Sequence, residues 1–267
     1  MSGPAVEINK LVVHAARRCV LDLDQLQIPA AEITAIMGLN GAGKTTLLRT
    51  CLGFVTPTRG KVRVLDCNLS QLRGGLLARL RRRVGYVPQL LPAHSDLPLT
   101  VREIVAIGRT GRAGLFRPFT KVDWRTVDEW IERLGLTLLS GRSFGEISGG
   151  EQRKTILARA MAQQPELLLL DEPTANLDLG WRERIVAIVQ RLHAETGITI
   201  VLVCHELEVL PPACRRVVLL DRGRVLAAGA PEDVFTTQRV RSLYGAGLRV
   251  THEGGRHAVL PGERVDV

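Results

Sequence analysis

The sequence predicts an α/β fold: a core with a mostly parallel sheet, to which an antiparallel β-subdomain and an inserted helical subdomain are added. Three features support this prediction. First, a glycine-rich loop lies between a short apolar segment and a helical pattern. Second, residues 167–170 and 198–203 are apolar runs typical of parallel strands that are buried on both faces. Third, proline and glycine residues interrupt a helical stretch that precedes these two runs. With 267 residues and 45% hydrophobic content, the chain can bury a sizeable core.

Nine consecutive residues form a candidate phosphate-binding loop that fits the pattern G-x-x-x-x-G-K-[ST]. They are Gly38, Leu39, Asn40, Gly41, Ala42, Gly43, Lys44, Thr45 and Thr46. Residues 32–37 suit a buried strand and residues 46–52 have helical spacing, which is the context that the pattern requires. The glycines let backbone N–H groups point at a polyphosphate, Lys44 supplies charge for the β- and γ-phosphates, and Thr45 can bind Mg²⁺. We therefore predict a P-loop nucleoside-triphosphatase core.

The segments around this loop continue the pattern of strands and helices. Residues 6–13 and 20–28 alternate apolar and polar side chains, which predicts an antiparallel pair. Residues 60–65 and 83–87 predict two further strands, with a helix near residues 71–80 between them.

The predicted helical subdomain is inserted at about residues 90–162. Thr100 and Glu103 have the spacing of a capping box, which predicts a helix start. A second helix carries an apolar stripe that ends before Gly135, and ordinary core packing explains that stripe. The stripe consists of Trp124, Val127, Ile131 and Leu134.

Strands return after the helical subdomain, with a helix around residues 181–192 between the two apolar runs. Residues 217–220 and 225–227 flank Asp-Arg-Gly-Arg and predict a hairpin that closes the sheet. We expect the ATPase domain to cover residues 1–235. Residues 236–267 are expected to form a C-terminal tail, helical at first and then polar.

Two acidic residues, Asp171 and Glu172, end the apolar run of residues 167–170. They are expected at the carboxyl end of the sheet, where open α/β sheets bind ligands. Asp171 is placed to hold a Mg²⁺ ion, whereas Glu172 can orient and deprotonate the attacking water. The alternative is a solvated acidic turn before Pro173, and the phosphate loop favours the catalytic role.

Two more polar residues follow predicted strands at the same edge. His205 follows residues 198–203 and can contact the γ-phosphate, and Gln89 follows residues 83–87, from where its amide can touch both the metal ion and the attacking water. Neither residue alone identifies a site.

The composition limits the possible partners and compartments. The net charge of +9 is compatible with nucleic acid or an anionic membrane as a partner. However, the basic run of residues 79–83 lacks aromatic side chains, and only 4% of the chain is aromatic. We therefore favour a solvated basic face for this run. Five cysteines without a C-x-x-C pair indicate free thiols. Since no apolar run approaches about 20 residues and no signal peptide is evident, we expect a cytoplasmic protein.

The order of these motifs resembles the nucleotide-binding subunits of ATP-binding-cassette (ABC) transporters over roughly residues 6–235. The most specific motif, which other phosphate-loop ATPases lack, lies between Gln89 and Asp171. It consists of Ser148, Gly149, Gly150, Glu151 and Gln152. The resemblance implies ATP and Mg²⁺ as cofactors, Gln89 as the residue that couples the site to the permease, Glu172 as the catalytic base and His205 on the γ-phosphate.

The resemblance also implies a homodimer that closes on ATP. The helix that begins at Ser148 offers N–H groups without intrahelical partners, which makes a second anion site. Because the phosphate loop already holds the chain's own phosphates, residues 148–151 are expected to serve in trans the nucleotide of another copy. Asp178 matches the dimer-contact loop of the family.

Three positions depart from the family pattern. Ala15 stands where the family usually has an aromatic that stacks on adenine, so poor discrimination between ATP and GTP is predicted unless a neighbour such as His14 does the stacking. Ile147 and Leu39 replace the usual leucine and proline, which changes little of the chemistry.

A narrower resemblance covers residues 84–119 and points to importers of metal ions and metal chelates, of the zinc, manganese and iron type. The expected function is therefore the ATP-hydrolysing subunit of such an importer. It would be peripheral on the inner face of the cell membrane, joined to an integral membrane permease and, through it, to a substrate-binding protein.

Two rival functions are weighed against transport. One is a soluble cassette ATPase that acts on nucleic acid or the ribosome, which the basic charge supports. Ribosome-associated members of the family resemble two cassettes in tandem, whereas this chain has one cassette. No nucleic-acid partner is therefore expected. The other is a binding module without turnover, which the presence of Lys44, Glu172 and Gln89 disfavours.

Overall fold

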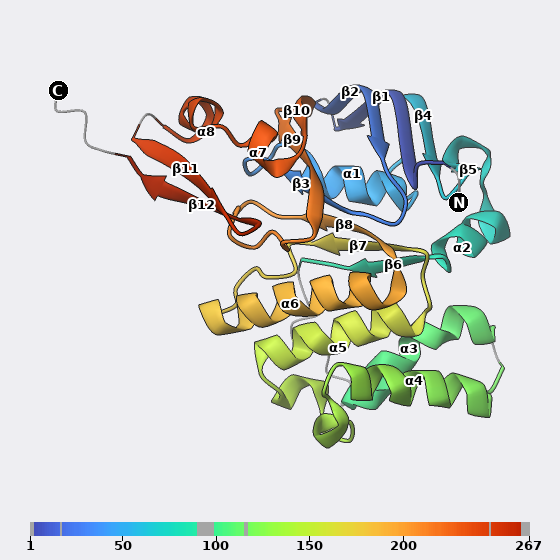
Figure 1. Ribbon diagram of the computed structural model, residues 1–267. Coiled ribbons are helices and arrows are strands. Elements are labelled where there is room, and N and C mark those ends of the chain that lie inside the picture. The colour runs from blue at the N-terminus through green and yellow to red at the C-terminus, as the bar shows by residue number, and fades with distance from the viewer. Residues whose placement is uncertain (1–2, 17, 90–98, 115–116, 246, 263–267) are drawn as a thin grey trace.

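The computed structural model describes residues 3–16, 18–89, 99–114, 117–245 and 247–262. Two sheets enclose one helix, and further helices cover the other face of the larger sheet (Figure 1). The predicted fold class is confirmed. Residues 90–98, with Pro92 and Pro98, and residues 115–116 belong to the segment that resembles metal importers and lie outside the described residues.

The larger sheet has six strands in the order β10-β9-β3-β8-β7-β6. Its strands are β3 (Ile33–Met37), β6 (Val84–Val87), β7 (Leu167–Asp171), β8 (Thr199–Val203), β9 (Cys214–Asp221) and β10 (Arg224–Gly229). All neighbouring pairs are parallel except β9 with β10, which form the predicted hairpin. Every residue of β3, β7 and β8 is buried, because helices or the second sheet cover both faces. The carboxyl ends of the parallel strands therefore meet at one edge.

The smaller sheet is antiparallel and has the order β2-β1-β4-β5. Its strands are β1 (Val6–Ala15), β2 (Arg18–Ile28), β4 (Arg59–Val64) and β5 (Cys67–Asn68). Helix α1 (Lys44–Cys51) lies between the two sheets, and α2 (Gly74–Arg81) leads back to β6 (Figure 1). The inward side chains of β1 and β2 join those of α1 in one apolar core.

Four longer helices form a second core on the opposite face of the larger sheet (Figure 1). They are α3 (Val101–Ala113), α4 (Lys121–Arg133), α5 (Gly149–Ala162) and α6 (Leu179–Thr196). The predicted capping box at Thr100 and Glu103 is confirmed, and Thr120 with Asp123 forms a second one at the start of α4. Among the described residues, no helix combines the length and the hydropathy that a membrane span requires.

The C-terminal tail, predicted as helical and then polar, also contains a β-hairpin that the sequence did not predict. After α7 (Pro231–Val234) and α8 (Thr237–Tyr244), strands β11 (Leu248–Glu253) and β12 (Arg256–Pro261) pair as a hairpin around Gly254 and Gly255. Leu248, Val250 and Val259 of the hairpin pack against the core that the longer helices form, but they are scattered among polar residues, so the sequence showed no clear strand pattern. Arg256 pairs with Glu183 of α6, and the Val259 N–H donates to Glu208 at 3.0 Å.

The helical subdomain contains a buried ion pair between α3 and α4. The Arg109 guanidinium donates to Asp123 Oδ1 at 2.7 and 3.0 Å, and both residues are buried. The other carboxylate oxygen of Asp123 accepts from Thr120. Hydrogen bonds from Thr120, followed by those from Arg109, lower the pKa of Asp123 to about 2.

We predict that Asp123→Asn lowers the free energy of unfolding by about 3 kcal/mol, because it leaves Arg109 buried without its charge partner. The matched control is Asp128→Asn, since Asp128 pairs with Arg102 across the same helices in an exposed setting and its loss should change less than about 1 kcal/mol. Denaturant unfolding measures both.

The same variant has an expected pH dependence. The pKa of Asp123 is depressed in the folded chain, so its contribution is complete above about pH 4 and is lost as the pH falls toward about 2. Asp123→Asn should lack this part of the acid destabilisation. Equal losses for Asp123→Asn and Asp128→Asn at neutral pH would contradict the role given to burial.

Candidate functional site

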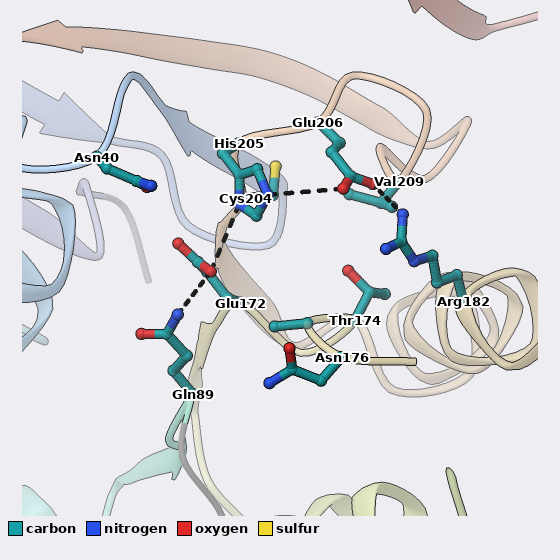
Figure 2. Close-up of a pocket in the computed structure, with 11 residues that line it drawn as sticks. Asn40, Gln89, Glu172, Thr174, Asn176, Arg182, Cys204, His205, Glu206 and Val209 are labelled. Atoms are coloured by element: carbon teal, nitrogen blue, oxygen red, sulfur yellow. Dashed lines mark hydrogen bonds and ion pairs between the residues drawn. The ribbon is translucent and has the colours of Figure 1, made fainter. Parts of the chain in front are cut away.

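A pocket of about 280 Å³ opens at the carboxyl ends of the parallel strands (Figure 2). Its lining joins groups from the phosphate loop, the end of β6, the turn after β7, the segment after β8 and the first turn of α6. They are Asn40, Gln89, Glu172, Thr174, Ala175, Asn176, Arg182, Cys204, His205, Glu206 and Val209. The parallel pairing of β6, β7 and β8 therefore brings Gln89, Glu172 and His205 together, as the sequence predicts.

The phosphate loop requires glycine at two positions for steric reasons. A Cβ on Gly38 would lie 2.1 Å from the Leu220 carbonyl oxygen, and one on Gly43 would lie 2.6 Å from Leu21 Cδ2. Both glycines have positive φ, of 146° and 98°. Gly43 is the N-cap of α1, and no side chain caps this helix, so its first N–H groups remain available for an anion.

Lys44 points back into this loop. Its Nζ donates to the carbonyl oxygens of Gly38 at 2.8 Å and Leu39 at 3.1 Å, and the residue is 5% exposed. Burial lowers the pKa of Lys44, and the nearby carboxylate of Glu172 opposes this effect. The ammonium group is thus held in place beside the uncapped helix start, where a phosphate group can accept its hydrogen bonds.

Thr45 and Asp171, two of the three residues predicted to hold Mg²⁺, form a fitting pair of oxygen donors. Thr45 Oγ1 lies 3.0 Å from Asp171 Oδ1, and the Tyr86 hydroxyl donates to Asp171 Oδ2 at 3.3 Å. Asp171 is 1% exposed, and burial raises its pKa, so a cation bound there would compensate a buried negative charge. Hydroxyl and carboxylate oxygens are ligands that Mg²⁺ prefers, and phosphates complete its shell in nucleotide sites.

Glu172 stands at the centre of the pocket (Figure 2). Its Oε2 accepts from Gln89 Nε2 at 2.7 Å and lies 3.4 Å from His205 Nδ1, while His205 Nε2 lies 3.6 Å from Glu206 Oε1. The backbone of Glu172 has a φ of 46°, which is rare for a residue with a side chain. Such strain is typical of residues whose direction matters for function. Here it aims the carboxylate at Gln89 and His205.

Three residues that no sequence motif singled out also contribute to this site. Tyr86 holds Asp171, and its hydroxyl in an otherwise apolar strand was a usable signal. Arg182 pairs with Glu206 and donates to the Leu177 carbonyl, and Arg153 donates to the Pro88 carbonyl. Each arginine joins segments far apart in the sequence, so spacing alone gave no signal.

Residues 148–151, the signature motif that is expected to serve another copy, lie outside this pocket. Ser148 is the N-cap of α5, with the reciprocal bonds of a capping box to Glu151, and Gly149 and Gly150 form the first turn. Asp178 is the N-cap of α6, where its Oδ1 accepts from the Trp181 N–H at 2.9 Å. The chain thus presents a helix start that its own phosphate loop does not use.

His14 and Ala15, the two positions considered for stacking on adenine, are exposed at the end of β1. His14 pairs in register with Cys19 of β2, and its Nδ1 lies 3.1 Å from Thr58 Oγ1. The next residue of β2, Val20, has its carbonyl oxygen beside Gly43. His14 is therefore an exposed ring on the β1–β2 hairpin that borders the phosphate loop.

Comparison with known proteins identifies the family. Residues 21–175 match the family described as ABC transporter. The chain is 37% identical over 222 residues to the chelated iron transport system membrane protein YfeB of Yersinia pestis, covering 83% of this chain and 72% of YfeB. It is 36% identical over 249 residues to the zinc transport system ATP-binding protein TroB of Treponema pallidum, covering 92% and 89%.

Solved structures show the same fold. A chain of an ABC transporter in an inward-facing conformation aligns with a TM-score of 0.81 at 24% identity, covering 99% of this chain and 100% of that one. An ATP-binding cassette solved as a dimer, in a post-hydrolysis state with ADP and phosphate, aligns with a TM-score of 0.73 at 26% identity, covering 84% and 98%.

The contact between α5 and α6 yields a prediction about the two signature glycines. A Cβ on Gly150 would lie 1.9 Å from Trp181 Cδ2, whereas one on Gly149 meets only Leu177 Cδ2 at 3.9 Å. Gly150→Ala must displace the indole and should lower the free energy of unfolding by about 1–3 kcal/mol. Gly149→Ala should keep or slightly raise it, because alanine favours helices.

Denaturant unfolding of both variants measures the difference. Gly150→Ala combined with Trp181→Leu should recover part of the stability lost, since the smaller side chain leaves room for the methyl group. Equal effects of the two glycine substitutions would contradict the steric argument.

Proposed function

Because the chain belongs to the ABC transporter family, we propose that it is the ATP-hydrolysing subunit of an importer for a metal ion or metal chelate, working with a partner permease. The meeting of the phosphate loop with Asp171, Glu172, Gln89 and His205 at one sheet edge is the observation that carries the ATPase assignment. The rival role on nucleic acid or the ribosome is not favoured, because the relatives compared are transport subunits.

The phosphate loop binds and orients the nucleotide. The backbone N–H groups from Gly41 to Thr46 and the Lys44 ammonium hold the β- and γ-phosphates, which take over the hydrogen bonds that Lys44 makes to Gly38 and Leu39. His14, the exposed ring on the neighbouring hairpin, is the candidate to stack on adenine in place of an aromatic at Ala15.

Glu172 acts as the general base that takes a proton from the attacking water. Its hydrogen bond with Gln89 and its approach to His205 fix the carboxylate, and its low exposure limits competing solvent. Water enters between Gln89 and Glu172, so that the amide orients it while the carboxylate accepts its proton. His205 turns from Glu172 to donate to the γ-phosphate.

Thr45, Asp171 and Gln89 are the residues proposed to hold Mg²⁺. Bound there, the ion would supply positive charge that neutralises the negative charge developing during phosphoryl transfer. Tyr86 keeps Asp171 oriented through its hydrogen bond to Oδ2.

A second copy of the chain completes each site. The start of α5 at Ser148, with Gly149, Gly150 and Glu151, contacts the nucleotide held by the phosphate loop of the other copy, and Asp178 lies in the contact between the two. The dimeric cassette with ADP and phosphate supports this arrangement, as does the position of residues 148–151 outside the chain's own pocket.

The proposed role in transport also implies partner proteins and a location at the membrane. Residues 1–235 form the ATPase unit, which binds an integral membrane permease on the inner face of the cell membrane, while residues 236–267 form an appendage. A substrate-binding protein delivers cargo to the permease from the other side. The names of the iron and zinc relatives and the resemblance of residues 84–119 support a metal ion or metal chelate as cargo.

We predict that Glu172→Gln forms a stable dimer with MgATP and hydrolyses it at least about 100-fold more slowly, because the amide keeps the shape of the side chain but cannot accept the proton. Lys44→Ala should neither bind ATP nor dimerise. Light scattering with and without MgATP, together with phosphate release, measures these outcomes. If Glu172→Gln binds ATP yet stays monomeric at high concentration, two isolated chains do not complete each other's nucleotide sites.

The cargo is tested in cells. Deletion of the gene should slow growth in chelator-treated medium, and one added metal should restore it. The wild-type gene should complement the deletion, whereas the matched Lys44→Ala allele should not. Normal growth under zinc, manganese and iron limitation, with unchanged cell metal content, would remove metals as the cargo.

A further inference from the structure

We propose that Arg153 is a positioning residue for hydrolysis, which ties the backbone of Gln89 to the helix that carries residues 148–151. This inference rests on the proposed ATPase function and adds a residue that the sequence motifs did not assign. Arg153 lies on α5, a little more than one turn after its N-cap Ser148. It is therefore carried by any movement of the signature helix.

The contacts of Arg153 go to one short segment. Its two terminal nitrogens donate to the carbonyl oxygens of Pro88 at 2.8 Å and Gln89 at 3.1 Å. This segment directly follows β6, and it turns the Gln89 side chain toward the pocket, where Gln89 Nε2 donates to Glu172 at 2.7 Å. A continuous path of hydrogen bonds thus runs from α5 through Arg153 and Gln89 to the proposed catalytic base.

The electrostatics of Arg153 are unusual for a residue that only supports the fold. It is 3% exposed, and within the part of the chain that the structure describes it has no carboxylate partner, while its Nε is buried without a hydrogen bond. Burial alone shifts the pKa of Arg153, downward from its ordinary value. Arg109, the other deeply buried arginine of the helical subdomain, has Asp123 as counter-ion.

A buried cation without a counter-ion opposes folding, so packing alone does not explain an arginine here. The planar guanidinium can hold two adjacent carbonyl oxygens at once, which a lysine or glutamine holds less rigidly. Two bonds to neighbouring residues fix both the place and the orientation of the Gln89 backbone. We therefore assign to Arg153 the task of keeping Gln89 in line with Glu172.

This arrangement links two nucleotide sites in the proposed dimer. Residues 148–151 of one copy meet the nucleotide of the other, whereas Gln89 serves the nucleotide of its own copy. Arg153 connects these two groups within one chain. When the nucleotide of the other copy contacts the start of α5, Arg153 would thereby fix the position of Gln89 in this copy's own site.

A double-mutant cycle tests the proposal on the full chain. Arg153→Gln should lower kcat for MgATP about tenfold, with KM and ATP binding changed less than about twofold, and Arg153→Lys should recover part of the loss. In a Gln89→Ala background, Arg153→Gln should change kcat less than about twofold, because the side chain that Arg153 positions is absent. Arg159→Gln, which removes a half-buried arginine from the same helix, is the matched control and should leave kcat near wild type.

Melting temperatures of all variants show whether a loss of kcat is accompanied by a loss of stability, which separates a positioning role from a role in folding. Additive losses of Arg153→Gln and Gln89→Ala, or a kcat loss equal to that of Arg159→Gln, would overturn the proposal and leave Arg153 a structural residue. In the Glu172→Gln background, Arg153→Gln should still give the MgATP-dependent dimer. A wild-type chain without ATPase activity would instead overturn the proposed function, and the role of Arg153 with it.

Discussion

The structure depends on the parallel pairing of four strands in the larger sheet. Because β6, β7, β8 and β3 run in the same direction, the residue that follows each strand emerges at the same edge. These residues are Gln89, Glu172, His205 and the phosphate loop. An antiparallel order would have divided them between the two edges of the sheet. The chemistry of the site is thus a consequence of strand direction.

Neighbouring groups offset part of the charge in this site, where solvent has little access. Lys44 is close to Asp171 and Glu172, and each of these three groups is nearly inaccessible. Hydrogen bonds from Thr45, Tyr86 and Gln89 hold the carboxylates in fixed directions. Polar groups that are preorganised in this way are a main source of rate enhancement in enzyme sites.

The sequence predicted those parts of the fold and site that follow from local pattern. The glycine spacing of the phosphate loop, the buried strands and the polar residues after them required only periodicity and strand direction. The hairpin of β11 and β12 was missed because its few apolar residues are scattered among polar ones, and its contacts with Glu183 and Glu208 join residues that are distant in the sequence. Arg153 and Arg182 were missed for a similar reason, since a long side chain that reaches a distant partner, here the Pro88 carbonyl or the Glu206 carboxylate, leaves no periodic trace.

The order of strands has a consequence for the synthesis of the chain. Strand β3, which leads into the phosphate loop, lies between β8 and β9, and both of these strands are made long after it. While the ribosome adds the intervening residues, β3 has neither neighbour to pair with, and the closing of such distant contacts is slow. ATP therefore cannot template the early stages of folding. The nucleotide site is therefore complete only after β8 and β9 have paired with the two edges of β3.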